Sequence, residues 1–215
     1  NNTQPFFDEK NSGYFSNLVL KKFVLNPDSG KFSLLYPVFG IHALRRGACW
    51  LVHHRFPYLA VSYLLSGTIS VKQFGRTERI YAGEAYLVHR NENSTFFSSE
   101  EENYEQLVIG ISGTVTEMLT EELELGNRTK IIPAFPDKLE RQMRSIIFLL
   151  SRRPVDNRML SCRTYELLLG CSSPEDRTSG QYPKELQLAI QACESSLKGT
   201  PPLQMIAARA GISTA

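Results

Sequence analysis

From residue 14 to residue 113, short runs of alternating hydrophobic and polar positions follow one another, separated by turn-forming pairs such as Ser66-Gly67 and Gly83-Glu84. Alternation over four to eight residues is typical of half-buried strands, and many short strands at this spacing indicate a sandwich or a barrel. The expected strands are Val19–Val24, Phe32–Tyr36, Trp50–Val52, Leu59–Leu65, Thr68–Gln73, Thr77–Tyr81, Ala85–Val88 and Leu107–Ile111.

After Gly113 the hydrophobic positions recur every three or four residues, which is the period of an amphipathic helix. A short helix is expected over 115–125. A longer one follows, capped by Asp137, and its predicted inner face holds Leu139, Met143, Ile146, Ile147 and Leu150.

A further helix is expected over 159–169, and Pro154 marks the break before it. Its predicted inner face holds Cys162, Tyr165, Leu168 and Leu169. Together the two longer helices form a predicted hairpin. Its apolar side either covers the strands or, being wider than one core needs, meets a second subunit.

Residues 171–181 are polar and rich in turn formers, which indicates a linker. Beyond them a helix is expected from about Pro183 to Gly199. Thr200 can cap a second helix that Gly211 ends, and Ser213 can cap a third that begins at Thr214.

Composition describes a folded chain whose charges nearly cancel. The 215 residues are 42% hydrophobic, and 24 Lys and Arg face 22 Asp and Glu, for a net charge of +2. This length suggests about one and a half domains. Because the charge lacks the basic excess of a nucleic-acid-binding domain, composition disfavours DNA binding without excluding it.

The sequence shows no membrane segment and no signal peptide, so the cytoplasm is the default location. Its cysteines, Cys49, Cys162, Cys171 and Cys193, include no C-x-x-C pair. We therefore expect reduced, mostly buried thiols rather than a zinc site or a disulfide framework.

Residues suited to catalysis are scarce. His53 and His54 are adjacent, and neighbouring residues of a strand point to opposite faces, so they are not expected to line one interior. Arg55–Ala60 supplies no carboxylate, and no G-x-S-x-G or phosphate-binding glycine loop is present. We expect no metal, no cofactor and no enzymatic activity.

A ligand pocket inside the strands is a stronger prediction, because a small barrel can hold one small molecule. Arg55 could clamp a carboxylate or sugar hydroxyls, and Phe96 and Tyr104 could form aromatic walls. Gln106 would share a strand face with Val108 and Gly110, with room beside Gly110. Ordinary surface and core roles for these residues remain open.

The order of elements resembles the AraC/XylS family of transcriptional regulators. Tyr63-Leu64-Leu65-Ser66-Gly67, followed by Ala82-Gly83-Glu84-Ala85-Tyr86-Leu87-Val88, is similar to that family's paired hairpins, and Leu107 to Gly113 to its closing strand. Ile206-Ala207-Ala208-Arg209-Ala210-Gly211-Ile212-Ser213 is similar to the first helix and turn of its first helix-turn-helix.

The resemblance implies a mainly β fold with helices: a cupin-like effector-binding barrel over 1–113, helices over 114–170, the linker 171–181, and an incomplete DNA-binding domain over 182–215. It implies a homodimer through 137–170, promoter DNA and a small-molecule effector as partners, and effector contacts near Arg55, Phe96 and Gln106. Phe6 and Phe7 would cover the pocket. Val108 stands near the family's sugar-stacking aromatic, so a sugar is not indicated.

Ser213 and Thr214 would begin the recognition helix, whose first residues reach base edges in the major groove. Since the sequence stops there, we expect it to be part of a longer regulator. One alternative is a cupin enzyme with a metal acting on a small molecule, motivated by His53 and His54. Another is a regulator with a filled barrel that acts only through protein contacts.

Overall fold

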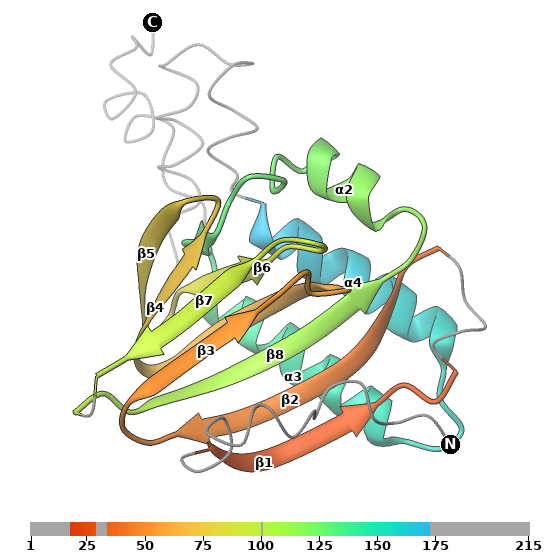
Figure 1. The fold of residues 1–215 in the computed structure, drawn as a ribbon. Helices are drawn as coiled ribbons and strands as arrows, with labels where there is room; N and C mark the ends of the chain where they lie inside the picture. The colour runs from red at the N-terminus through yellow and green to blue at the C-terminus, as the bar shows by residue number, and fades with distance from the viewer. Residues whose placement is uncertain (1–17, 29–33, 100, 173–215) are drawn as a thin grey trace, which may run out of the picture. The chain divides into compact units, whose positions relative to one another are not determined.

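The computed structural model describes residues 18–28, 34–99 and 101–172, all within the first of two compact units, residues 1–172. In this part of the chain, nine strands form two packed sheets with helices beside them (Figure 1). This confirms the predicted sandwich or barrel followed by a helical hairpin. The predictions for Phe6, Phe7, Cys193, Ser213, Thr214 and the whole of 182–215 lie outside the described residues.

Most strands come before the helices in the chain. The strands are β1 (Leu18–Leu25), β2 (Tyr36–Arg45), β3 (Cys49–His53), β4 (Leu59–Gln73), β5 (Arg76–Tyr81), β6 (Ala85–Val88), β7 (Ser94–Ser98), β8 (Tyr104–Ser112) and β9 (Lys130–Ile131). The helices are α2 (Thr116–Glu122), α3 (Pro136–Ser151) and α4 (Asn157–Cys171).

Strand β4 belongs to both sheets. Its first half pairs with β8 and β6 in the larger sheet, whose order is β1-β2-β8-β4-β6-β9. Its second half pairs with β5 and β7 in the smaller sheet, and β3 pairs with β7 at the edge of that sheet. All of these pairs are antiparallel. One continuous strand therefore carries the chain from one layer to the other.

The change of sheet takes place at Gly67. The pairing of β4 with β8 shifts register between Leu64 and Ser66, and Gly67 has a φ of +78°. A Cβ at Gly67 would lie 1.8 Å from the carbonyl oxygen of Asn103, so only glycine fits there. The predicted turn at Ser66-Gly67 is thus wrong, because this pair bends one long strand instead of ending it.

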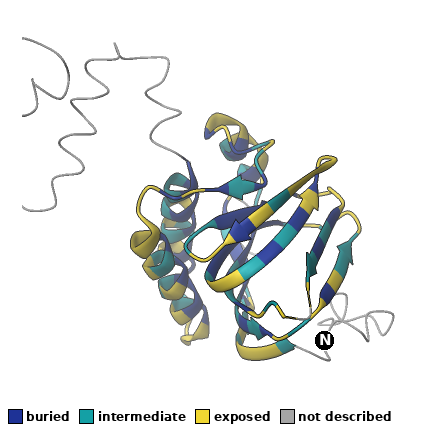
Figure 2. Cartoon of the chain, turned by 90° about the vertical axis from the view of Figure 1, so that its left-hand side faces the viewer, coloured by how far each residue is buried: buried dark blue, intermediate teal, exposed yellow. Residues whose placement is uncertain are grey.

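The larger sheet is covered on both faces, as the layers in Figure 2 show. On one face Val61, Leu107 and Ile109 share a hydrophobic core with Met143 and Ile146 of α3. On the other, between the sheets, a second core holds Ala60, Leu64, Ile69, Val71, Ile80, Tyr86, Val88, Phe96 and Tyr104. Burial on both faces explains why residues 59–64 of β4 and all of β6 are buried.

The inner face predicted for the longer helix is confirmed, since Leu139, Met143, Ile146, Ile147 and Leu150 of α3 are all buried. Its predicted cap is wrong. Phe135 precedes the helix without a capping side chain, Pro136 is its first residue, and Asp137 lies in the first turn. Proline suits this position because the first N–H groups of a helix lack internal acceptors.

Helix α4 begins two residues before its expected start, because Asp156 caps it and accepts a hydrogen bond from the Met159 N–H at 3.0 Å. Half of its predicted inner face is wrong, because Cys162 and Tyr165 are exposed, whereas Leu168 is buried and Leu169 packs against the same core. The buried face holds Leu160, Thr164, Leu167, Leu168 and Cys171. Thr164 tolerates full burial because its hydroxyl donates to the Leu160 carbonyl at 2.8 Å.

Three strands differ from the prediction for local reasons. Strand β2 runs over Tyr36–Arg45, whereas the predicted strand covers residues 32–36. The prediction missed most of β2 because Pro37 and Gly40 are unusual inside a strand. A Cβ at Gly40 would lie 2.8 Å from Cγ1 of Ile147, so glycine here lets α3 approach the sheet. Strands β7 and β9, of five and two residues, were not predicted.

Three cysteines fall within the described residues, and all are free: Cys49 and Cys171 are buried and Cys162 is exposed. Burial raises the pKa of Cys171 to about 12, which keeps its thiol protonated. In the same part of the chain, no helix is long and apolar enough to cross a membrane.

Candidate functional site

A cavity of about 420 Å³ opens among strands of both sheets and the loop that joins β3 to β4. Its described lining is mainly hydrophobic and aromatic. The lining residues are Leu18, Leu20, Phe23, Phe39, Ile41, Ala43, Leu51, Val52, His53, His54, Phe56, Pro57, Tyr58, Ala60, Ser62, Ile69, Tyr86, Val88, Phe96, Tyr104, Gln106 and Val108. A volume of this order is typical of a small-molecule site.

Strand alternation explains which side chains reach the cavity. Along β2, Phe39, Ile41 and Ala43 line it, and along β8 Gln106 and Val108 do so. The intervening residues Leu107 and Ile109 belong to the core under the helices. Each central strand thus supplies one wall of the cavity and one support for the hairpin.

Three of the four predicted ligand residues lie on the cavity wall: Phe96, Tyr104 and Gln106. The Tyr86 hydroxyl donates to Oε1 of Gln106 at 2.6 Å, and the Tyr104 hydroxyl contacts Sγ of Cys49 at 3.9 Å. Their position agrees with a pocket inside the strands. That they bind a ligand stays a prediction.

The fourth, Arg55, is exposed and is not among the described lining residues. It has a φ of +48°, in the left-handed region, and its backbone N–H donates to Oδ1 of Asn93 at 3.2 Å. Its neighbours His54 and Phe56 do line the cavity. Arg55 therefore shapes the loop at the cavity without forming part of the wall.

The space predicted beside Gly110 is filled. A Cβ at Gly110 would lie 2.2 Å from Cε1 of Phe39, so the Phe39 ring occupies the position that a side chain at Gly110 would need. The prediction of room there is wrong because it considered β8 alone. Phe39 comes from β2, which pairs with β8 directly beside Gly110.

His53 and His54 both line the cavity, which corrects the expectation that they could not share one interior. Strand β3 ends at His53, so the alternation stops there, and the exposed His54 lies at the mouth. The His53 ring stacks on Phe56 with centroids 5.0 Å apart and meets Phe96 edge-on at 5.1 Å. Burial lowers the pKa of His53 to about 4, so the ring is neutral at pH 7.

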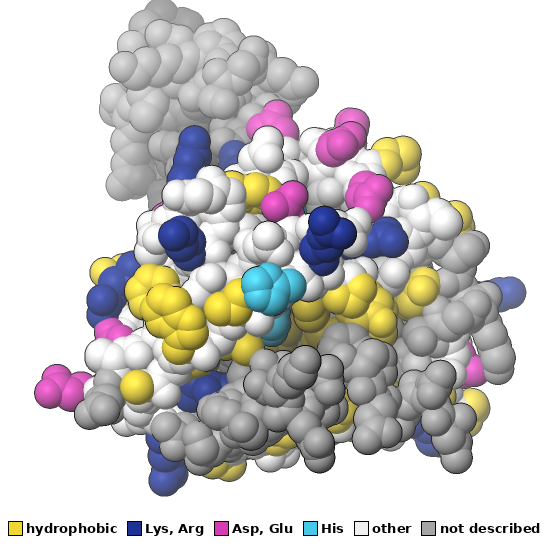
Figure 3. Space-filling model, viewed as in Figure 1, with side chains coloured by type: hydrophobic (Ala, Val, Ile, Leu, Met, Phe, Trp, Pro, Cys, Tyr) yellow, Lys and Arg dark blue, Asp and Glu magenta, His cyan; other side chains and the backbone are white. Residues whose placement is uncertain are grey.

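Several aromatic residues of the wall were not predicted. Phe56 and Tyr58 meet edge-on with centroids 5.9 Å apart, and Phe39 and Tyr58 meet at 6.1 Å. The sequence contains a signal for them, since Phe56-Pro57-Tyr58 is an aromatic loop directly before a buried strand. In the face seen in Figure 3, histidine and hydrophobic side chains lie side by side in a band below basic ones.

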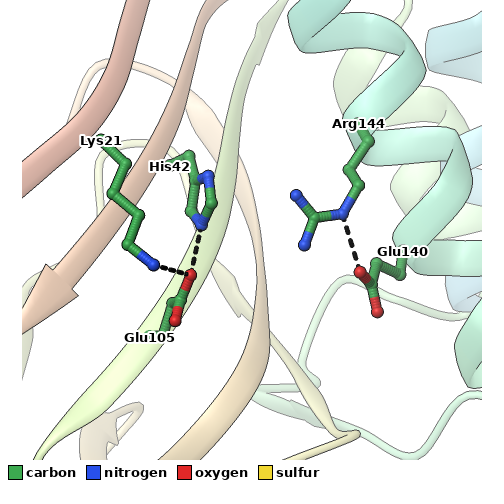
Figure 4. A network of polar contacts seen from close by, with 5 residues as sticks. All are labelled: Lys21, His42, Glu105, Glu140 and Arg144. Carbon is green, nitrogen blue, oxygen red and sulfur yellow. Dashed lines mark hydrogen bonds and ion pairs between the residues drawn. The ribbon is translucent and has the colours of Figure 1, made fainter.

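On the helix side of the larger sheet, a polar cluster joins three strands (Figure 4). Oε1 of Glu105 on β8 lies 2.5 Å from Nζ of Lys21 on β1 and 2.5 Å from Nε2 of His42 on β2. The hydrogen bonds from Lys21 and His42 lower the pKa of the Glu105 carboxyl. Arg144 and Glu140 form a pair on α3 opposite the cluster. The cluster fixes β1, whose Leu18, Leu20 and Phe23 face the cavity.

A metal centre finds few ligands in the described ranges. No three His, Cys, Asp or Glu side chains there lie close enough together to hold an ion. Among these four residue types, the described cavity wall contains only histidine, and the exposed His54 lies at the mouth of the cavity. These residues do not fit the three-ligand sites that catalytic metals use in proteins.

Three solved structures resemble the chain distantly. The AraC-like transcriptional activator CuxR shares 11% identity at a TM-score of 0.45, over 83% of this chain and 67% of its own. A predicted oxalate decarboxylase from Thermotoga maritima shares 16% at 0.32, over 36% and 68%. The cupin domain of an XRE family transcriptional regulator from Enterobacter cloacae shares 11% at 0.36, over 45% and 96%.

Sequence comparison is more decisive than these structural likenesses. No curated protein matches the chain. The family model described as the AraC-like ligand binding domain, in contrast, matches residues 39–168, which is more than half of the sequence. The match begins in β2 and ends in α4, so it spans most of the strands and both helices of the hairpin. The chain thus belongs to the family of AraC-like ligand-binding domains, and its strand arrangement confirms the predicted mainly β, cupin-like fold.

Proposed function

We propose that the cavity between the sheets binds a small-molecule effector and that this domain is the sensing part of a transcription regulator. The observation that carries the proposal is the cavity of about 420 Å³ inside the matched family domain, with a mainly apolar wall and few polar groups. Such a wall is typical of sites that bind small molecules. The helix-turn-helix pattern of residues 206–213 supports the regulatory role.

A binding role is favoured over a catalytic one. The described wall holds no Asp, Glu, Lys or Cys, so its acid–base groups are histidines and tyrosines, and it offers no carboxylate that could orient a histidine beside Ser62. His53 is a single neutral base with no charged partner among the described lining residues. The metal-dependent cupin enzyme has correspondingly less support.

We further infer that the hairpin of α3 and α4 forms a homodimer contact. Phe148 on α3 is 50% exposed, and Met159 and Tyr165 on α4 are 42% and 44% exposed. Exposed hydrophobic side chains that form one contiguous patch are characteristic of surfaces that meet another protein.

The test uses the product of the complete gene. It is incubated with fragments of the genomic DNA of its source, and bound fragments are sequenced at two salt concentrations. We expect a few fragments to be enriched, with binding that weakens steeply as salt rises, because phosphate contacts release counterions. Absence of any sequence preference would contradict the regulatory role.

A matched pair of variants then tests the sensing role. Val108→Phe places a larger side chain in the cavity, and Val19→Phe makes the same change at an exposed position of β1 outside the described lining. Metabolites extracted from the source are added to each protein on its enriched DNA fragment. We expect the extract to shift DNA affinity in the wild type and in Val19→Phe but not in Val108→Phe. An equal response of all three proteins would place the effector elsewhere.

A further inference from the structure

Side chains of permanent charge are absent from the described wall of the cavity. None of its residues is Lys, Arg, Asp or Glu, and Arg55 lies outside it. Burial raises the pKa of Tyr58, which keeps its phenol neutral as well. A carboxylate or phosphate buried there would find no Lys or Arg to pair with among the described lining residues, which is costly in an apolar environment. The wall therefore favours a neutral and mainly apolar ligand.

Aromatic rings shape the part of the wall around His53. Its ring is nearly parallel to that of Phe56, with an interplanar angle of 10°, and Phe96 and Tyr58 meet this pair edge-on. Tyr86 lies 5.9 Å from Phe96 by ring centroids. Faces and edges of aromatic rings attract other rings in offset or T-shaped contacts, so this wall suits a flat aromatic ligand.

His53 supplies a specific polar contact. Its Nδ1 atom is buried and has no hydrogen-bond partner. A buried N–H without an acceptor is rare in folded proteins, so the single ring proton of the neutral imidazole belongs on Nε2. Nε2 is then the ring nitrogen that a ligand can reach, and it is a donor. Gln106 adds a second donor. Its amide oxygen accepts the hydrogen bond from Tyr86, so its NH₂ group is the part of the amide that can donate to a ligand.

We propose that the effector is a neutral aromatic molecule that carries a hydrogen-bond acceptor such as a carbonyl oxygen, and that His53 recognises this acceptor through Nε2–H. This inference rests on the proposed function, because it names the class of ligand that the proposed site takes. It also assigns His53, which strand alternation alone does not distinguish from a core residue, as the specificity-determining residue of the cavity.

The test compares two probes of nearly identical shape. The first, 2-naphthamide, is neutral and carries a carbonyl, and the second, 2-naphthoate, is an anion at pH 7.5. Binding to the full chain is measured by saturation-transfer NMR titration, with D-glucose as the polyol probe. We expect 2-naphthamide to bind at least tenfold more tightly than 2-naphthoate and glucose to show no transfer. Equal or tighter binding of 2-naphthoate or glucose, or no binding of 2-naphthamide, would overturn the proposal.

A second comparison isolates His53. The variant His53→Phe keeps an aromatic ring against Phe56 but removes the donor, and 2-methylnaphthalene is a probe without an acceptor. One net hydrogen bond corresponds to about a fivefold change in affinity. We expect His53→Phe to weaken 2-naphthamide about fivefold and to leave 2-methylnaphthalene within twofold of wild type. Unchanged 2-naphthamide binding, or equal weakening of both probes, would remove His53 from this role.

The two proposals fail in different ways. If the genomic selection finds no preferred DNA, the regulatory role falls, and the binding measurements with naphthalene probes are unaffected. If DNA affinity responds instead to an anionic or polyhydroxylated metabolite through the same cavity, the regulatory role stands and the neutral aromatic class is wrong.

Discussion

His53 shows how much a single residue depends on its surroundings. In the sequence it is one of two adjacent histidines, and the chemistry that such a pair first suggests is metal binding. In the structure it is a buried, neutral ring at the end of β3 that stacks on Phe56 in a mainly apolar wall. None of these properties can be predicted from residue type, because each depends on how the chain folds around His53.

The neutral His53 predicts a pH dependence of stability. Its pKa is about 4 in the folded protein and 6.5 in the unfolded chain, so the unfolded state binds more protons between these values. Stability is therefore lost as the pH falls below about 6.5, by about 2 kcal/mol at pH 5 from this residue. Urea denaturation at pH 7.5 and pH 5 measures the loss, and His53→Phe should reduce it by that amount. An identical loss in the variant would show that His53 is not buried as a neutral ring.

At the scale of elements, the prediction succeeded where a segment faces one environment along its whole length. The inner face of α3 was predicted because Leu139, Met143 and Ile146 all meet one sheet. It failed for β2, because Pro37 and Gly40 interrupt the alternation of hydrophobic and polar residues. Pro37 lies at a register shift opposite β8, and Gly40 makes room for α3. For the site, the sequence prediction assigned Phe96 and Gln106 to the pocket, and both line the cavity. It also assigned Arg55, which is not among the described lining residues, because the backbone at Arg55 turns with a φ of +48° in the loop after β3.

Strand β4 offers a test of a local requirement for glycine. Gly67→Ala would place a Cβ 1.8 Å from the Asn103 carbonyl oxygen at a φ of +78°, and we expect it to cost at least about 3 kcal/mol of unfolding free energy. Gly75→Ala has a similar φ of +72°, but nothing lies within 4 Å of its Cβ. This control should cost about 1 kcal/mol. Similar losses in urea denaturation would mean that β4 does not need the close approach to Asn103.

At the scale of the whole folded unit, the hairpin and the strands share one core. Met143 of α3 is fully buried beside Val61 of β4 and Ile109 of β8 in the same hydrophobic cluster. Removing part of that core should therefore weaken the sheet as well as the helix. Sequence periodicity predicted the two elements separately, but it could not show that they form one cooperative unit, since that depends on how closely α3 meets Gly40 of β2.

Met143→Ala measures this coupling. We expect a loss of about 2 to 5 kcal/mol from the cavity that it leaves. Trp50 is the single tryptophan and packs on Phe97 in the smaller sheet, with ring centroids 5.6 Å apart. Its fluorescence and the far-ultraviolet circular dichroism should shift to lower urea together. Arg141→Ala, an exposed position on the same helix, should leave both in place. A shift in circular dichroism alone would mean that the strands unfold independently of α3.

The double coverage of β4 also bears on how such domains diversify. Leu59, Val61 and Tyr63 of this strand must fit the helices, whereas Ala60 and Ser62 face the cavity. Mutations at the first set of positions therefore change the packing against the helices, and mutations at the second set change the cavity wall. A substitution at Ala60 or Ser62 can change the cavity wall while the packing of the hairpin on the sheet stays unaltered. Alternate positions of one strand therefore let the cavity change while the core beneath the helices stays constant.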